Sequence, residues 1–345
     1  MRRAPLAWDR RVVVWDTAMA AVRDVLRRAG LREVSTPCRA PAPAIEPYIE
    51  PIPAGPQWLM TSPELAMKRL LCRGSGPIFQ LAHVFRGGEI GANHREEFHL
   101  LEWYRLGDDM RLLESDVEAI VAAVCTALGA DAVVPRRWRR VGFFDVFAET
   151  TGVQLRGDED ARALELAVSA DVALHELVFR RHAPGPMAAN DPEVRSFATW
   201  LAVYSAWSTV LDGWLAGQGG VHLVDFPAPL AALAECAEVG DASGAEHRAS
   251  RSIARRMESY VGAVELANGY RELRDAGEQR RRFERVNALR GACELDGLPL
   301  DDAFLADLAE LGLPACTGIA LGLDRLIMLA CDAASLADID LAPPR

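Results

Sequence analysis

Residues 79–104, FQLAHVFRGGEIGANHREEFHLLEWY, contain the pattern that decides the fold. They predict two strands joined by a charged loop that contains glycine. Counting by two along the second strand places four side chains on one face: Phe98, Leu100, Glu102 and Tyr104. A buried carboxylate beside an aromatic hydroxyl is costly unless a cation meets it. Arg86, at the end of the first strand, is a forked donor suited to a phosphate. The segment therefore indicates a site for a nucleotide and a cation.

The composition is that of an ordinary globular protein, with 345 residues, of which 50% are hydrophobic and 25% charged. No run approaches the roughly 20 apolar residues that a membrane helix needs. The N-terminus has arginines but no apolar stretch typical of a secretory signal. The seven cysteines are far apart and form no CxxC pair, which indicates reduced thiols. We expect a cytoplasmic protein with no membrane partner.

Residues 256–265, RMESYVGAVE, predict a hairpin with a two-residue turn at Val261 and Gly262. This register sets Glu258 directly opposite Glu265, and directly opposed like charges destabilise a pair of strands. Either a cation lies between the two carboxylates, or the pKa of one is raised. The alternative is a solvated edge pair in a shifted register.

Five segments resemble, in order and spacing, the motifs of class II aminoacyl-tRNA synthetases, and most of all those of the lysyl branch. They are residues 32–38 (REVSTPC), 61–71 (TSPELAMKRLL), 79–104, 265–272 (ELANGYRE) and 318–325 (GIALGLDR). Within that branch the chain is similar to the short paralogues that attach lysine or β-lysine to a lysine of elongation factor P. Only the stretch at about 136–220 matches poorly.

This resemblance implies an α+β fold, the class II synthetase catalytic core, in which a mostly antiparallel sheet is flanked by helices. It implies a single catalytic domain over residues 1–345, with a helical insertion at about 136–220. A helix predicted at 10–30 ends at a glycine and precedes a strand at 31–38. In the family this pair forms the interface of a homodimer, and a helix packed within the monomer is the alternative.

The resemblance also implies an ATP site that uses Mg²⁺. Arg86 would hold the α-phosphate and the acyl carboxylate, Arg325 the terminal phosphates, and Phe98 would stack on adenine. The other matching ATP positions are Glu89, His94, Glu265, Leu266 and Gly322. Glu258 and Glu265 would be the magnesium ligands, where a metal offsets charge that develops at phosphorus.

Two positions of the loop depart from the family pattern, which has an acidic residue at Gly88 and an asparagine at Arg95. Either Glu89 takes the missing acidic role and Arg95 contacts a phosphate, or this loop binds ATP poorly.

The implied amino-acid pocket is acidic. The lysine chain and its ε-ammonium would meet Glu102, Tyr104, Asn268, Tyr270 and Glu272, the last three of which share a strand face by period two. No basic residue lies in phase to neutralise these carboxylates, which favours a long basic substrate over a neutral one. The alternative is a solvated polar strand face. Substrate-binding positions at the start of a predicted helix are Ser62, Pro63 and Glu64, of which Glu64 would bind the amino group. Ala320 stands where tRNA-charging relatives have glycine.

Together these features imply an ATP-dependent ligase that adenylates lysine or β-lysine and transfers it to a lysine side chain of elongation factor P. One alternative acceptor is a carrier protein or a small amine, and another alternative is a non-catalytic paralogue that binds a basic amino acid. A tRNA substrate is disfavoured, because the net charge is −11 and because residues 10–38, which resemble motif 1 of the family, begin too early for a preceding anticodon-binding domain. The basic clusters at 136–140 and 280–282 are most simply solvated faces.

Overall fold

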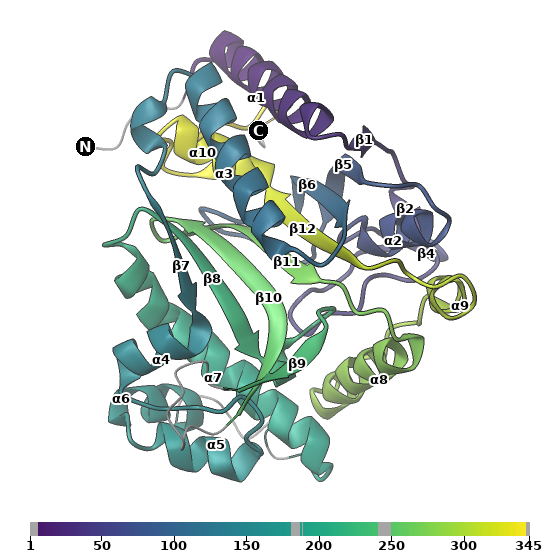
Figure 1. Cartoon of the computed structure of the whole chain (residues 1–345), viewed down its shortest axis with the longest axis vertical. Coiled ribbons are helices and arrows are strands. Elements are labelled where there is room, and N and C mark those ends of the chain that lie inside the picture. The colour runs from purple at the N-terminus through teal and green to yellow at the C-terminus, as the bar shows by residue number, and fades with distance from the viewer. Residues whose placement is uncertain (1–5, 181–186, 188, 241–249, 343–345) are drawn as a thin grey trace.

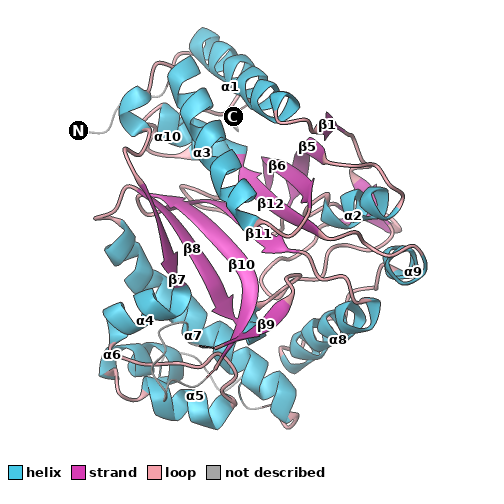
Figure 2. Ribbon diagram, viewed as in Figure 1, coloured by secondary structure: helices cyan, strands magenta, loops and turns pink. Residues whose placement is uncertain are grey.

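The computed structural model describes residues 6–180, 187, 189–240 and 250–342. A nine-stranded sheet crosses the molecule, and helices pack on both of its faces (Figures 1 and 2). In their order across the sheet, the strands are β1 (Arg32–Glu33), β5 (Ile78–Phe85), β6 (Glu97–Leu106), β12 (Cys316–Gly322), β11 (Val264–Arg271), β10 (Arg251–Val261), β8 (Gly220–Pro227) and β7 (Trp138–Gly142), with β9 (Cys236–Val239) paired to β10.

The sheet is antiparallel except at its two ends, where β1 pairs with β5 and β7 with β8 in parallel. The predicted α+β fold, with a mostly antiparallel sheet flanked by helices, is therefore confirmed. The two strands expected within residues 79–104 are β5 and β6, which pair in register from Ile78–Tyr104 to Phe85–Glu97.

One face of the sheet is covered by α1 (Trp8–Arg28), α3 (Met110–Ala127) and α10 (Leu323–Ala330). Apolar residues every four positions along α1 are completely or almost completely buried: Val14, Ala18, Val22 and Leu26. These three helices lie together at the top of Figure 1, close to both ends of the chain. The segment that resembles motif 1 is thus fixed to the helix that carries Arg325.

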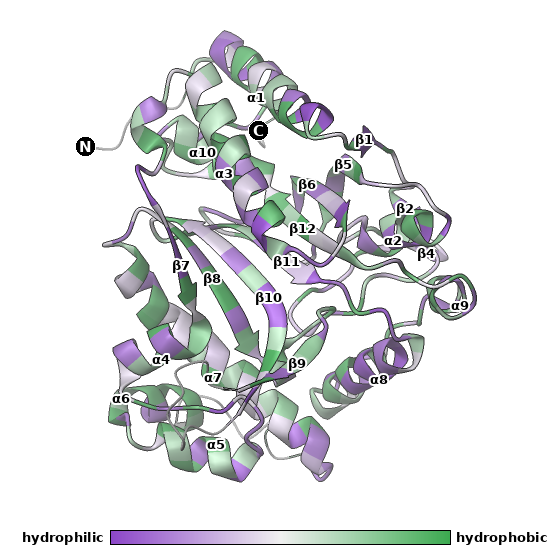
Figure 3. Cartoon of the chain, viewed as in Figure 1, coloured by the Kyte–Doolittle hydropathy of each residue, from purple (hydrophilic) through white to green (hydrophobic). Residues whose placement is uncertain are grey.

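The opposite face is covered by helices from several parts of the chain: α2 (Glu64–Cys72), α4 (Phe143–Thr151), α7 (Pro192–Leu215), α8 (Ala276–Ala292) and α9 (Asp302–Glu310). Shorter elements are α5 (Ala161–Val168), α6 (Val172–His175), a π-helical turn η2 (Glu176–Arg180) and the 3₁₀ turns η1 (Asp131–Val133), η4 (Ala228–Leu230) and η5 (Leu336–Asp338). Figure 3 contrasts the largely hydrophobic β8 with α8, which carries many hydrophilic residues. Strand β8 is accordingly almost wholly buried between helices and neighbouring strands.

The stretch expected to be a helical insertion contains β7 and α4 to α7. Within this stretch the sequence pattern predicts helices at 160–179 and 192–215, separated by a loop at 182–191. The helices correspond to α5 to η2 and to α7, and most of the loop lies outside the described residues. Rings from α4, α7 and β8 pack together, with Phe143 4.7 Å from Trp207 and 5.2 Å from Phe226 between centroids. These aromatic contacts attach α4 and α7 to the main sheet, of which β7 is itself a strand.

Two local expectations are corrected at the start of the chain. The strand expected at 31–38 pairs only at Arg32–Glu33, although the backbone of Val34 and Thr36 still donates to Phe79 and Gln80 of β5. Residues 40–57 are rich in proline, which predicts an irregular loop; they contain part of a small second sheet of three strands: β2 (Arg39–Ala40), β3 (Pro53–Ala54) and β4 (Gln57–Leu59).

The predicted register of the β10–β11 hairpin is wrong. Val261 pairs with Val264, so the turn residues are Gly262 and Ala263, and Gly262 has a left-handed φ of 55° that suits glycine. Tyr260 faces Glu265, a bulge follows, and Glu258 lies opposite Asn268 instead of Glu265. The bulge inserts one residue into β11, which sequence alternation alone does not reveal.

Candidate active site

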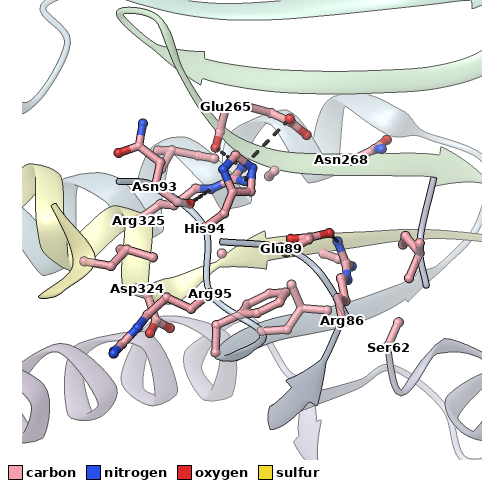
Figure 4. Close-up of a pocket in the computed structure, with 18 of the residues that line it drawn as sticks. Ser62, Arg86, Glu89, Asn93, His94, Arg95, Glu265, Asn268, Asp324 and Arg325 are labelled. Atoms are coloured by element: carbon pink, nitrogen blue, oxygen red, sulfur yellow. Dashed lines mark hydrogen bonds and ion pairs between the residues drawn. The ribbon is translucent and has the colours of Figure 1, made fainter. Parts of the chain in front are cut away.

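A cavity of about 140 Å³ opens where β6, β11 and β12 meet the loops at 40–57 and 87–96 (Figure 4). Most of the predicted site residues line it: Ser62, Glu64, Arg86, Glu89, His94, Phe98, Glu265, Leu266, Asn268, Tyr270, Ala320, Gly322 and Arg325. The remaining predicted residues lie outside its lining: Pro63, Glu102, Tyr104, Glu258 and Glu272. Segments far apart in the sequence therefore converge on one cavity, with five predicted residues outside its wall.

Arg86 leaves the end of β5 and lies against the ring of Phe98, with its guanidinium carbon 5.2 Å from the ring centroid. Its Nε donates to the carbonyl of Thr61 at 3.2 Å, and its Nη1 lies 3.8 Å from a carboxylate oxygen of Glu89. Gly88 has a left-handed φ of 75°, and this turn brings Glu89 towards the arginine. The altered loop thus still supplies an acidic partner for Arg86.

Arg325, in the first turn of α10, is held by groups from two other segments (Figure 4). It donates to the carbonyl oxygens of Asn93 at 3.2 Å and Glu265 at 3.0 Å, and lies 2.8 Å from His94 Nε2. Burial and the adjacent guanidinium lower the pKa of His94, so the neutral ring accepts from Arg325. These contacts aim the guanidinium along the cavity wall.

Arg95 forms an ion pair with Asp340 near the C-terminus, while still lining the cavity. Asp324 accepts from the backbone N–H of His99 at 2.7 Å, and so ties α10 to β6. Among the described residues, Asp324 and Arg325 form no ion pair with each other, although both lie in the first turn of α10. Each of these charges therefore connects separate elements.

The two carboxylates expected to bind magnesium have different surroundings. Glu258 is only 1% exposed, and its oxygens accept from Arg256 at 2.6 Å, from Tyr204 at 2.9 and 3.1 Å, and from Tyr260. Glu265 faces the cavity, with 41% of its side chain exposed and its nearest cation, Arg325, at 3.9 Å. Although Glu265 is exposed in the cavity, the protein atoms around the cavity limit its hydration, and this effect and then the Glu258 carboxylate raise the pKa of Glu265. Neither carboxylate belongs to a solvated edge pair of the expected kind.

Neither periodicity nor a motif in the sequence indicates Tyr204 and Arg256 as partners of Glu258. Tyr204 lies on α7, 54 positions away from Glu258, within the stretch that matches the family poorly. Arg256 is on the same strand as Glu258, but its importance comes from burial against Phe226, 4.6 Å away. Only the packing of α7 against the sheet brings these groups together.

Behind the cavity wall, Glu102 is 2% exposed and accepts one hydrogen bond at each oxygen, from Ser62 and from Tyr104, both at 2.6 Å. Burial raises the pKa of Glu102 to about 8, and Glu64 adds to this effect. Glu272 is packed against Gly318, where an added Cβ would lie 2.3 Å from its carboxylate. A larger residue at 318 would therefore close the space that Glu272 occupies.

The expectation that no basic residue neutralises these carboxylates is wrong. Lys68 has no exposed surface, and its Nζ lies 2.5 Å from both Glu64 and Glu272. Burial acts to lower the pKa of Lys68, but the two carboxylates raise it above its ordinary value. The Glu–Lys spacing of four on α2 was visible in the sequence. The contact between this face of α2 and Glu272 comes from tertiary packing, so the spacing alone could not predict it.

The comparisons with known proteins agree with this arrangement. The family model described as tRNA synthetases class II (D, K and N) matches residues 9–344. Curated proteins named elongation factor P–(R)-beta-lysine ligase align over most of the chain. That of Pectobacterium carotovorum subsp. carotovorum (strain PC1) is 36% identical over 332 residues, or 93% of this chain and 91% of the relative. That of Sodalis glossinidius (strain morsitans) is 35% identical over 334 residues, or 93% and 92%. The chain belongs to the class II tRNA synthetase family of the D, K and N type.

Proposed function

We propose that this protein is an ATP-dependent ligase that activates lysine or β-lysine and transfers it to a lysine side chain of elongation factor P. The observation that carries the proposal is one cavity that joins two arginines, an aromatic ring and a cluster of carboxylates. The names of relatives that are 35–36% identical over most of the chain support the same substrates.

The chemistry has two steps. A carboxylate oxygen of the amino acid attacks the α-phosphorus of ATP, which forms an acyl adenylate and releases pyrophosphate. The neutral amine of the acceptor lysine then attacks the acyl carbon, the bond to AMP breaks, and the amine loses its proton to solvent. We assign Arg86 to the α-phosphate and the amino-acid carboxylate, Arg325 to the terminal phosphates, and Phe98 to adenine. Catalysis would come from positioning and electrostatic stabilisation.

Of the two carboxylates expected to bind magnesium, only Glu265 is suited to do so in this arrangement. Glu265 faces the cavity and has no hydrogen-bond partner for its carboxylate among the described residues. Glu258 is poorly suited in this arrangement, because both of its oxygens already accept hydrogen bonds. Within the described chain, no group of three or more acidic, histidine or cysteine side chains is placed to hold a metal. A bound Mg²⁺ would therefore take most ligands from phosphate and water, and would neutralise phosphate charge.

Further parts of the proposal concern assembly and partners. The outer face of α1 exposes Trp8, Val12 and Val13 by 52%, 57% and 63%, which supports a homodimer through this helix. Seven free cysteines are compatible with work in the cytoplasm. No described helix is long and apolar enough to cross a membrane. The acidic net charge of −11 supports a protein acceptor over tRNA.

The test is co-expression of this protein with elongation factor P, followed by mass spectrometry of the factor. We expect one added lysyl-sized group on a single lysine, and no addition when Arg325→Ala replaces the unaltered protein. Robust charging of lysine tRNA with the factor unmodified would overturn the choice of acceptor. Absence of amino-acid-dependent exchange of pyrophosphate into ATP would instead favour a non-catalytic paralogue.

A further inference from the structure

Five acidic residues line the cavity, and four of them already have a partner. Glu64 is paired with Lys68, Glu89 lies 3.8 Å from Arg86, Glu265 lies 3.9 Å from Arg325, and Asp324 accepts from a backbone N–H. The fifth is Glu46, for which the described structure contains neither a hydrogen bond nor an ion pair. A carboxylate without a donor at the wall of a cavity is the group most in need of a cation.

Glu46 lies on the loop between β2 and β3 and is half-buried. It belongs to the walls of two adjoining cavities, the candidate active site and a second cavity of about 110 Å³ between this loop, α7 and α8. Burial raises the pKa of Glu46, and among the nearby cations Arg86 opposes that rise most strongly. Further along the same loop, the backbone carbonyl of Glu50 accepts from the N–H of Gly87 at 2.7 Å, so the loop that carries Glu46 runs beside Arg86 at this end of the cavity.

The inference rests on the proposed function, in which Arg86 holds the carboxylate of the amino acid. The amino group of lysine or β-lysine is one or two carbons from that carboxylate, so it must lie at the same end of the cavity. The resemblance assigns this amino group to Glu64. In this chain, however, the Glu64 carboxylate is bound at 2.5 Å by the fully buried Lys68. A substrate ammonium at Glu64 would share that carboxylate with Lys68, which also pairs with Glu272, whereas Glu46 has no cation within ion-pair distance among the described residues.

We propose that Glu46 is a specificity-determining residue that receives the amino group next to the substrate's carboxyl group. Lys68 then serves as a permanent counter-ion that joins Glu64 to Glu272 and holds α2 against the sheet. The loop at 40–57 becomes part of the amino-acid site, and Glu46 gives that site its preference for substrates with a cation near the carboxyl end.

The experiment compares Glu46→Gln with the unaltered protein and with Glu50→Gln. Glu50 is a matched control, because it lies on the same loop, is 54% exposed and pairs with Arg290 outside the cavity. The KM for lysine is measured by amino-acid-dependent pyrophosphate exchange, and lysine affinity by calorimetry. For Glu46→Gln we expect both to weaken by at least about tenfold, or about 1.4 kcal/mol, with the KM for ATP unchanged. Thermal unfolding checks that both variants are folded.

A second substrate identifies which end of the amino acid Glu46 contacts. 6-Aminohexanoate keeps the carboxylate and the distal ammonium of lysine but lacks the amino group near the carboxyl. We expect Glu46→Gln and the unaltered protein to bind it equally. An equal loss with both compounds would overturn the proposal, as would unchanged lysine binding. Normal exchange with slow transfer to the acceptor would also overturn it, because Glu46 would then act on the acceptor amine.

Failure of the proposed function would look different. The unaltered protein would then show no lysine-dependent exchange, whichever way Glu46→Gln behaves in calorimetry. Even in a protein that does not activate lysine, calorimetry can test Glu46. Lysine affinity at least about tenfold lower in Glu46→Gln than in the unaltered protein would still support the role of Glu46.

Discussion

The two ends of the candidate active site are built in opposite ways. At the phosphate end, Arg86, Arg325 and Glu265 keep 22%, 24% and 41% of their side chains exposed. At the amino-acid end, Lys68, Glu102 and Glu272 are at most 2% exposed. Lys68 pairs with Glu64 and Glu272, and Glu102 accepts hydrogen bonds from Ser62 and Tyr104. The phosphate end, here called the open end, is accessible to a ligand. The amino-acid end, here called the closed end, surrounds the ammonium group of Lys68.

The difference teaches how each end can respond to a substrate. Phosphate oxygens can reach the open arginines while these keep their bonds to backbone carbonyls. At the closed end, buried carboxylates must first be neutralised by an ammonium or by protons. Lys68 supplies the ammonium. Burial raises the pKa values of Glu102 and Glu272 to about 8, which favours the protonated, neutral form of each carboxyl group. A basic substrate must therefore exchange with a proton or find a carboxylate that is still unpaired.

The largest expected effect comes from breaking the closed end at Lys68. Lys68→Met leaves two buried carboxylates facing each other, and removal of one partner from a buried ion pair typically costs about 3–5 kcal/mol. We expect that loss in the free energy of unfolding, measured by urea denaturation. Adding Glu272→Gln to the same variant should recover part of it, because one of the two unpaired charges is then removed.

Arg28→Met is the matched control, because Arg28 and Asp24 have the same spacing of four on a helix but are 80% and 55% exposed. An exposed pair of this kind contributes only about 0.3–0.5 kcal/mol. Equal small losses for both variants would show that Lys68 does not hold the closed end together.

A substitution at the open end should lower the reaction rate and leave the free energy of unfolding nearly unchanged. Arg325→Ala removes a donor that we assign to the terminal phosphates, and loss of one such charge-stabilising donor typically slows a reaction by about 100- to 1,000-fold. We expect that decrease in lysine-dependent pyrophosphate exchange, with a free energy of unfolding close to that of the unaltered protein. Unchanged exchange would remove Arg325 from the ATP site.

The two ends also differ in how far sequence reasoning could reach them. Arg86, Phe98 and Arg325 were predicted from short motifs, because each projects from the end of a strand or the start of a helix that the local pattern defines. Lys68 and Glu46 were missed as site residues. Lys68 acts through a contact between α2 and the end of β11, and Glu46 through the path of an irregular loop. Neither contact leaves a periodic signal.

The fold shows the same limit on a larger scale. Alternation predicted the strand pair at 79–104 and the hairpin at 256–265, helical spacing predicted the helix at 10–30, and the resemblance implied their assembly into one sheet. The bulge near Tyr260 did not follow, because one inserted residue changes the register of the hairpin without changing its composition. This change of register affects one part of the candidate active site. Glu258 accepts hydrogen bonds from Tyr204 and Arg256 instead of lying directly opposite Glu265.

That difference between Glu258 and Glu265 gives the third prediction. Glu265→Gln should lower adenylate formation by at least about tenfold, or about 1.4 kcal/mol, and raise the Mg²⁺ concentration needed for half-maximal rate. Glu258→Gln should lower the rate by at least a similar factor, but with little change in that Mg²⁺ concentration, because its oxygens serve Arg256 and the two tyrosines. Identical shifts of Mg²⁺ dependence in both variants would restore the paired-ligand assignment.

The smallest expected effect is a dependence on pH at the closed end. Because burial raises the pKa of Glu102 from 4.5 to about 8, its carboxyl is mostly protonated at pH 7 in the ligand-free protein. A bound ammonium favours the ionised form, so lysine binding should release a proton and strengthen with pH. A smaller fraction of Glu102 is ionised at pH 7 than at pH 8, so we expect the affinity for lysine to be severalfold lower at pH 7.

The ligand-free protein should show the opposite trend in stability. A folded-state pKa above the ordinary value means that the contribution of Glu102 to stability is fully present below about pH 4.5 and is lost as the pH rises through about 8. Calorimetry in phosphate and in Tris, at both pH values, measures affinity and proton release together, and Glu102→Gln should flatten both. Equal affinity at pH 7 and pH 8 without proton release would mean that Glu102 is already ionised. The closed end would then hold a negative charge at Glu102 before any substrate binds.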